Sequence, residues 1–171
     1  MPRTYALIVA AGRGTRVGDT TPKQYLPLAG LPLLRYSVAR FLAHPEIDGV
    51  RVVIHPDDRS LYDECICGLE LCEPVAGGVT RQESVSNGLT SLMGSEPDCI
   101  LIHDGARPFV SDSLISRLIS ALGEYSGAIP ALPVVDSLKV GSDGIVVDER
   151  ARDNLWRAQT PQAFIFKDIL R

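Results

Sequence analysis

Apolar residues in this sequence alternate between strand-like and helix-like patterns. The first is a continuous apolar run at Tyr5–Ala10, which is typical of a strand buried on both faces of a sheet. Similar short apolar segments predict four more strands, at Val50–Ile54, Leu71–Ala76, Cys99–His103 and Ala128–Val135.

Between these strands, apolar residues recur at helical spacing. The three stripes are Leu34, Val38, Phe41 and Leu42; Val85, Leu89 and Leu92; and Leu114, Leu118, Ile119 and Leu122. Strands that alternate with helices predict right-handed crossovers and an α/β fold, a doubly wound and mostly parallel sheet covered on both faces. Ligands of such sheets bind beyond the carboxyl ends of the strands.

One segment departs from this alternation. Ser137–Val140 and Gly144–Val147 flank the turn sequence Gly141-Ser142-Asp143-Gly144, which predicts a β-hairpin. A lone hairpin is marginally stable in water, so its apolar face needs a packing partner. That partner is either a second subunit or the hairpin's own domain, and the sequence leaves both open.

Length and composition indicate one globular domain. The chain has 171 residues, of which 45% are hydrophobic, and this is enough for a core without a disulfide or a structural metal. No apolar run reaches the roughly 20 residues that span a bilayer, and the N-terminus lacks the features of a signal peptide. We expect a single domain over residues 1–171, a cytoplasmic location and no membrane partner.

The charge pattern favours a small anionic ligand. The net charge is −4, yet residues 1–40 hold six basic side chains against one acid, Asp19. A local cationic segment on an acidic protein suits a small anion better than nucleic acid, which the rest of the surface would repel. The four cysteines do not have zinc-site spacing and are expected to be free thiols. The histidines His44, His55 and His103 are scattered and form no metal motif, so any bound metal should be a hard, oxygen-ligated ion.

A glycine-rich segment follows the first predicted strand. Gly12, Gly14 and Gly18 have neither the dinucleotide-binding nor the Walker spacing. Arg16 and Lys23 flank this segment, and two cations beside a glycine loop can hold a triphosphate and neutralise the charge on a leaving pyrophosphate. A structural turn with solvated cations has the same pattern, so the loop alone leaves that alternative open.

Five blocks along the chain carry a more specific signal. They are Ala10–Arg16 with Pro22–Tyr25, Gly77–Val85, His103–Pro108, Pro133–Lys139 and Leu155–Gln162. In order and spacing they resemble the 2-C-methyl-D-erythritol 4-phosphate cytidylyltransferase family of sugar-phosphate nucleotidyltransferases. The resemblance implies a Rossmann-like nucleotidyltransferase sheet with a projecting β-arm at about residues 137–153. It also implies that the family's C-terminal part is missing here, and members fused to a cyclodiphosphate synthase leave open whether the parent chain is bifunctional.

The resemblance also implies a CTP site. Its nucleotide-binding residues would be Ala10, Ala11, Gly12, Gly14, Gly78, Ser84 and Asp104. Arg16 and Lys23 would be catalytic, because they would stabilise the pentacoordinate transition state at the α-phosphorus. Asp104 would hold the cofactor Mg²⁺ against the triphosphate, although an Asp after a strand can also simply cap a turn.

For the acceptor, the resemblance implies methylerythritol phosphate bound by Arg107, Ser137 and Arg152. Ser137 and Arg152 would come from the β-arm of a second subunit, which makes the protein a homodimer through its arms. Ser137 stands where the family usually has threonine, and Gly105 replaces the usual alanine. Neither change removes a donor or a charge, so only local packing is affected.

Three other functions are alternatives to this one. A cytidylyltransferase for another polyol phosphate, such as D-ribitol 5-phosphate, shares several of the same blocks. An NAD-dependent oxidoreductase would need an acidic residue about twenty positions after the loop, where this chain has Leu34, Arg35 and Tyr36. Among proteins that are not enzymes, the remaining alternative is a noncatalytic nucleotide-binding module.

Overall fold

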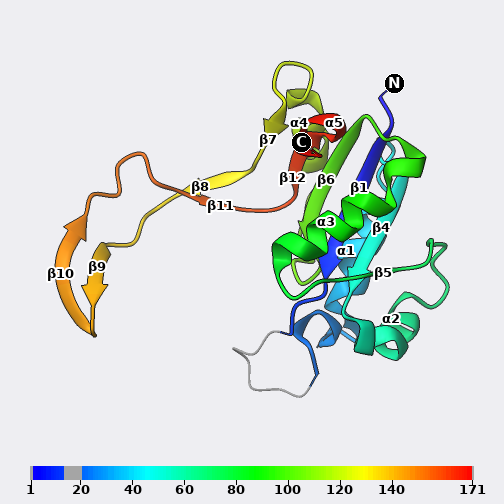
Figure 1. Cartoon of the computed structure of the whole chain (residues 1–171), viewed down its shortest axis with the longest axis horizontal. Coiled ribbons are helices and arrows are strands. Elements are labelled where there is room, and N and C mark those ends of the chain that lie inside the picture. Colours follow the sequence, from blue (N-terminus) through cyan, green and yellow to red (C-terminus); the bar gives the residue numbers. More distant parts are fainter. Residues whose placement is uncertain (1, 14–20, 171) are drawn as a thin grey trace.

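The computed structural model describes residues 2–13 and 21–170, and its centre is a six-stranded sheet (Figure 1). The strand order is β5 (Val75–Ala76), β4 (Gly49–Ile54), β1 (Thr4–Ala10), β6 (Cys99–Asp104), β12 (Gln162–Ile165) and β7 (Gly127–Ala128). β1 lies between β4 and β6 and runs parallel to both, and β5 is parallel to β4. β12 is antiparallel to both of its neighbours, β6 and β7. The prediction of a mostly parallel α/β sheet is confirmed.

Helices cover both faces of this sheet. One hydrophobic cluster contains buried residues of α1 (Leu33–Leu42), α2 (Arg59–Ile66) and α4 (Asp112–Ala121). A second cluster contains buried residues of α3 (Arg81–Ser91) and α5 (Phe166–Ile169). In β1, Ala6 and Ile8 face the first cluster and Leu7 faces the second, because successive strand residues point to opposite faces.

The three predicted helical stripes are found in α1, α3 and α4, with Leu92 and Leu122 as the C-cap residues of α3 and α4. α2 was not predicted, although its buried residues Tyr62 and Cys65 lie one helical turn apart on the first face. The remaining short elements are the 3₁₀ helices η1 (Lys23–Tyr25), η2 (Pro56–Asp58) and η3 (Met93–Ser95), and the small hairpin of β2 (Pro27–Leu28) and β3 (Leu31–Pro32).

Two predicted strands were too long, and prolines explain both errors. In the predicted strand Leu71–Ala76, only Val75–Ala76 pairs, because Pro74 lacks the N–H that a ladder needs. The predicted strand Ala128–Val135 is divided around Pro130 into β7, which belongs to the sheet, and β8 (Ala131–Pro133), which leaves it. Strands β11 (Trp156–Ala158) and β12 had not been predicted.

The predicted hairpin forms and projects from the body of the molecule (Figure 1). β8 pairs with β11 (Trp156–Ala158) as a ribbon, and beyond this ribbon β9 (Leu138–Ser142) pairs with β10 (Ile145–Arg150). Asp143 and Gly144 make a two-residue turn with positive φ values of 52° and 80°, as Asp-Gly favours in tight hairpins. We call residues 137–153 the arm. It does not fold back onto its own sheet, and Ile145, Val146 and Val147 are exposed.

Within the described part of the chain, no helix is long and apolar enough to cross a membrane.

Candidate active site

A cavity of about 920 Å³ lies at the carboxyl ends of β1 and β6. Its lining comes from five places: the end of β1, the segment containing η1, His55 in the connection after β4, the segment that begins α3, and the turn after β6. Eight residues predicted for the site line it: Ala10, Ala11, Gly12, Lys23, Gly78, Ser84, Asp104 and Arg107. Gly14 and Arg16 lie outside the described residues.

Lys23 is held at the cavity by its neighbour Gln24. The Gln24 side chain is buried, and its Nε2 donates hydrogen bonds to the carbonyl oxygens of Ala10, at 2.6 Å, and Gly12, at 3.0 Å. These bonds join η1 to the start of the glycine-rich segment. The glycine-rich segment and the Pro22–Tyr25 block, which are separate in the sequence, are therefore in direct contact in the fold.

Arg13 at the rim of the cavity is anchored to the connection between β4 and α2. Its Nη1 lies 2.8 Å from the buried Asp58, and its Nη2 lies 2.9 Å from Asp57 and 2.8 Å from His55 Nδ1. Neither Arg13 nor His55 was predicted as a site residue. Because two carboxylates already pair with this guanidinium group, we assign Arg13 to holding the start of the loop.

The segment before α3 forms another wall. Thr80 and Glu83 form a capping box, in which the Thr80 hydroxyl accepts from the Glu83 amide and the Glu83 carboxylate accepts from the Thr80 amide. Ser84 Oγ accepts a hydrogen bond from the Gly78 amide at 3.1 Å and donates one to the Thr80 carbonyl at 3.0 Å. A Cβ at Gly78 would stand 2.3 Å from the Glu83 Cβ, so this position needs glycine.

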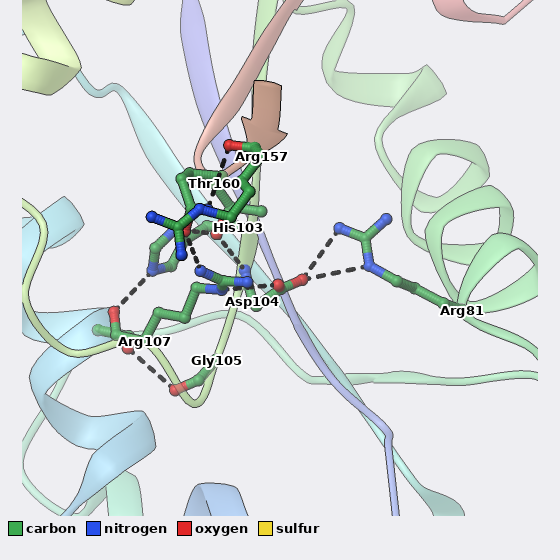
Figure 2. A network of polar contacts seen from close by, with 9 residues as sticks. Arg81, His103, Asp104, Gly105, Arg107, Arg157 and Thr160 are labelled. Carbon is green, nitrogen blue, oxygen red and sulfur yellow. Dashed lines mark hydrogen bonds and ion pairs between the residues drawn. The ribbon is translucent and has the colours of Figure 1, made fainter. Parts of the chain in front are cut away.

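Asp104, the last residue of β6, carries the only carboxylate among the described residues that line the cavity (Figure 2). Its Oδ1 accepts from Arg81 Nη2 at 3.0 Å, and its Oδ2 accepts from Arg107 Nε at 3.0 Å. The side chain therefore forms ion pairs with two arginines. Arg81 was not given a role from the sequence, although it lies within the Gly77–Val85 block. A Cβ at Gly105 would lie 2.9 Å from Leu34 Cδ1, so glycine suits the packing of this chain.

The donor set around Asp104 limits how a metal can bind. Among the described residues, no three His, Cys, Asp or Glu side chains are grouped as metal ligands. Asp104 is 31% exposed and opens into the cavity. One accessible carboxylate fits Mg²⁺ held mainly by substrate phosphates and water, which is a common arrangement for this ion.

Ser137 and Arg152 do not line the main cavity of their own chain. Both border a separate hollow of about 480 Å³ in the arm, together with Glu149 and Arg150. The Arg152 guanidinium group donates a hydrogen bond to the carbonyl oxygen of Val135. Within one chain, Ser137 and Arg152 therefore lie apart from Arg107, the third predicted acceptor contact.

Comparisons with known proteins identify the family of this chain. The sequence model of the family IspD, 2-C-methyl-D-erythritol 4-phosphate cytidylyltransferase, matches residues 4–171. A bifunctional enzyme IspD/IspF from Paramagnetospirillum magneticum is 55% identical over 99% of this chain. The chain spans only 44% of that relative's length.

A shorter relative and a solved structure extend the comparison. A 2-C-methyl-D-erythritol 4-phosphate cytidylyltransferase from Cereibacter sphaeroides is 48% identical over 98% of this chain, which covers 75% of that protein. The crystal structure of 4-diphosphocytidyl-2C-methyl-D-erythritol synthase from Anaerococcus prevotii superposes with a TM-score of 0.82 at 31% identity. That match covers 99% of this chain and 72% of the other.

Proposed function

This chain belongs to the 2-C-methyl-D-erythritol 4-phosphate cytidylyltransferase family, and we propose that its protein makes 4-diphosphocytidyl-2-C-methyl-D-erythritol from CTP and 2-C-methyl-D-erythritol 4-phosphate. Pyrophosphate is the second product, and the reaction belongs to non-mevalonate isoprenoid biosynthesis. One observation supports the proposal most strongly: eight residues from separate sequence blocks line a single cavity at the carboxyl edge of the sheet.

The chemistry needs little beyond positioning and charge stabilisation. A phosphomonoester has a second pKa near 6, so the acceptor phosphate is already an anionic nucleophile at neutral pH. One of its oxygens attacks the α-phosphorus of CTP in line, while the bond from that phosphorus to the oxygen bridging to the β-phosphorus breaks. The electron pair leaves with pyrophosphate, and no general base is required.

Cationic side chains stabilise this transfer. Lys23 lies at the cavity, where its ammonium group meets the negative charge that grows on the phosphoryl oxygens. We assign the same role to Arg16. Ala10, Ala11, Gly12, Gly78 and Ser84 surround the cytosine and ribose, with Gly14 as a further contact on the nucleotide. The small side chains at these positions bring backbone groups close to the base, so a pyrimidine fits and a larger purine is excluded.

Asp104 would hold Mg²⁺ against the triphosphate. When bound there, the ion would supply neutralisation of phosphate charge. Arg81 and Arg107 pair with the two Asp104 oxygens, so these guanidinium groups fix the carboxylate at the end of β6. Each arginine also remains close enough to the cavity to contact a bound anion.

The acceptor site is completed by a second subunit. Arg107 lies in the main cavity, whereas Ser137 and Arg152 lie on the arm. In a homodimer that exchanges arms, these two residues enter the partner's cavity and bind the methylerythritol phosphate. We place this dimer in the cytoplasm, with CTP and a polyol phosphate as its small-molecule partners.

An acceptor-specific assay tests the proposal. Full-length protein is incubated with CTP, Mg²⁺ and either methylerythritol phosphate or D-ribitol 5-phosphate, and pyrophosphate release is followed. We expect release with methylerythritol phosphate. Release only with ribitol phosphate would replace the acceptor and keep the mechanism, whereas binding of CTP without turnover on either acceptor would favour a noncatalytic nucleotide-binding module.

A further inference from the structure

A buried histidine lies directly behind the proposed site. His103 is the residue before Asp104 in β6, and it is only 1% exposed. Its ring packs against the ring of Phe41 in α1, with centroids 5.1 Å apart and planes at 53°. An apolar side chain would fill this space without the free-energy cost of burying two ring nitrogens, so the hydrogen bonds of the ring need an account.

Both ring nitrogens have partners, and these partners define the tautomer (Figure 2). Nε2 lies 2.9 Å from the carbonyl oxygen of Arg107, which can only accept, so Nε2 carries the proton. In this tautomer Nδ1 has a free lone pair, so the Thr160 hydroxyl, 3.1 Å away, donates to it.

The same hydroxyl has a second bond. Thr160 Oγ1 lies 3.3 Å from the backbone nitrogen of Asp104 and accepts its N–H. The result is a directed series of hydrogen bonds from the Asp104 amide to Thr160, from Thr160 to His103, and from His103 to the Arg107 carbonyl. Arg107 Nη1 also donates to Gln159 Oε1 at 2.6 Å. These bonds join the end of β6, the turn at 104–107, and the segment that follows β11.

Resting on the proposed function, we propose that His103 is a positioning residue for the acceptor and nucleotide sites. Through Nε2 it fixes the backbone of Arg107, and through Nδ1 and Thr160 it fixes the backbone of Asp104. His103 lies within the sheet and contacts substrate through neither nitrogen. Its effect on catalysis passes through Asp104 and Arg107.

Two substitutions separate the two halves of this role. In His103→Asn, the amide oxygen takes a position near Nδ1 and still accepts from Thr160, but the donor to Arg107 is lost. In His103→Gln, the amide nitrogen takes a position near Nε2 and still donates to Arg107, but the acceptor for Thr160 is lost. We expect the Asn variant to raise KM for the acceptor about tenfold, and the Gln variant to raise KM for CTP by a similar factor, as one lost hydrogen bond predicts.

His44 provides a matched control. It is also buried and hydrogen-bonded, to the Asp112 carbonyl and Ser116, but it does not line the cavity. His44→Asn should lower Tm without changing either KM. If the His103 variants behaved like the His44 variant, with lower Tm and unchanged kinetics at 20 °C, His103 would be structural only and the proposal would be wrong.

A second pair of variants covers the case in which the His103 variants do not fold. Thr160→Val removes the hydroxyl and should raise KM for CTP as His103→Gln does, whereas Thr160→Ser should restore wild-type values. Equal KM values for all three residues at position 160 would overturn the proposal.

A spectroscopic measurement does not depend on the reaction. Nitrogen-15 NMR of the full-length protein should show His103 as the neutral Nε2–H tautomer at pH 7, and a protonated ring or the Nδ1–H tautomer would contradict the inference. If wild-type protein transferred no cytidylyl group, the proposed function would fail, while the tautomer and calorimetric CTP binding by the same variants would still test His103.

Discussion

The side-chain amide of Gln24 donates a hydrogen bond of 3.0 Å to the carbonyl oxygen of Gly12. Its second bond, to the Ala10 carbonyl, lies inside the protein, where Gln24 is only 4% exposed. A buried carbonyl without a donor loses free energy relative to water, so these two bonds strongly favour the observed contact between η1 and the end of β1. The position of Lys23 in the cavity therefore depends on the residue that follows it.

Replacing Gln24 by glutamate should weaken both stability and turnover. An ionised carboxylate has no donor and would face two carbonyl oxygens, so we expect about 1–3 kcal/mol of lost stability together with a lower kcat. Denaturant unfolding and pyrophosphate release measure the two effects. Gln82→Glu, at an exposed position on α3 that does not line the cavity, is the control and should change neither quantity.

Lys23→Ala should lower turnover by roughly 10²–10³-fold and leave the fold intact, because it removes charge stabilisation from the transition state. We expect the same of Arg16→Ala, although Arg16 lies outside the described residues. Steady-state kinetics and circular dichroism test both variants, with Lys167→Ala in α5 as the control. Turnover equal to wild type in either variant would remove that residue from the catalytic mechanism.

The sequence predicted those parts of the fold whose signals are local. Long apolar runs identified β1, β4 and β6, and helical stripes identified α1, α3 and α4, because each of these elements buries a regular face. Strands β11 and β12 were missed, since each is positioned by pairing with strands from an earlier part of the chain. Trp156 pairs with Pro133, and Ala163 pairs with Leu101, and no local pattern specifies either contact.

The site residues also differ in whether a local signal or a distant partner identifies them. The resemblance of five short blocks to the family implied eight residues that line the cavity. Gln24, Arg81 and His103 also belonged to those blocks, yet their functions depend on the partners that folding supplies. Arg81 meets Asp104 across 23 positions of sequence, and His103 meets Thr160 across 57. A motif can show that such a residue is present, but its partner becomes known only from the fold.

CTP binding should depend on Mg²⁺, and Asp104→Asn should remove most of this dependence. The amide is neutral and binds a hard divalent cation poorly, so we expect CTP affinity in excess Mg²⁺ to fall about tenfold or more, toward the value without metal. Titration calorimetry with and without EDTA measures the change. ATP and NAD should bind the wild type far more weakly than CTP, and equal affinity for ATP would contradict the pyrimidine-sized pocket.

Acid should destabilise the protein through His103. Burial lowers the native-state pKa of His103 below its unfolded value of about 6.5, so below that pH the unfolded chain binds a proton that the native state does not. The free energy of unfolding is therefore full above pH 6.5 and falls as the pH drops toward the native pKa. Urea unfolding between pH 7.5 and 5 should show a steeper loss for wild type than for His103→Gln. Parallel curves would show that another group causes the acid sensitivity.

The projecting arm predicts how the protein assembles. Ile145, Val146 and Val147 are exposed on a hairpin that projects from the sheet, and an apolar surface of this kind is stabilised by a partner. A two-fold dimer that exchanges arms covers this surface in both subunits and brings Arg152 into the cavity that holds the partner's Lys23.

Mixing two inactive variants tests this exchange. Arg152→Ala and Lys23→Ala proteins should each be nearly inactive alone, because each lacks one residue at every site. After subunit exchange, a heterodimer contains one site with both residues intact and one with neither. Random mixing makes half of the dimers heterodimers, so activity should recover to about a quarter of wild type. If verified exchange between folded variants restored nothing, Arg152 would serve its own chain or have no part in catalysis, and the arms would need another reason to project.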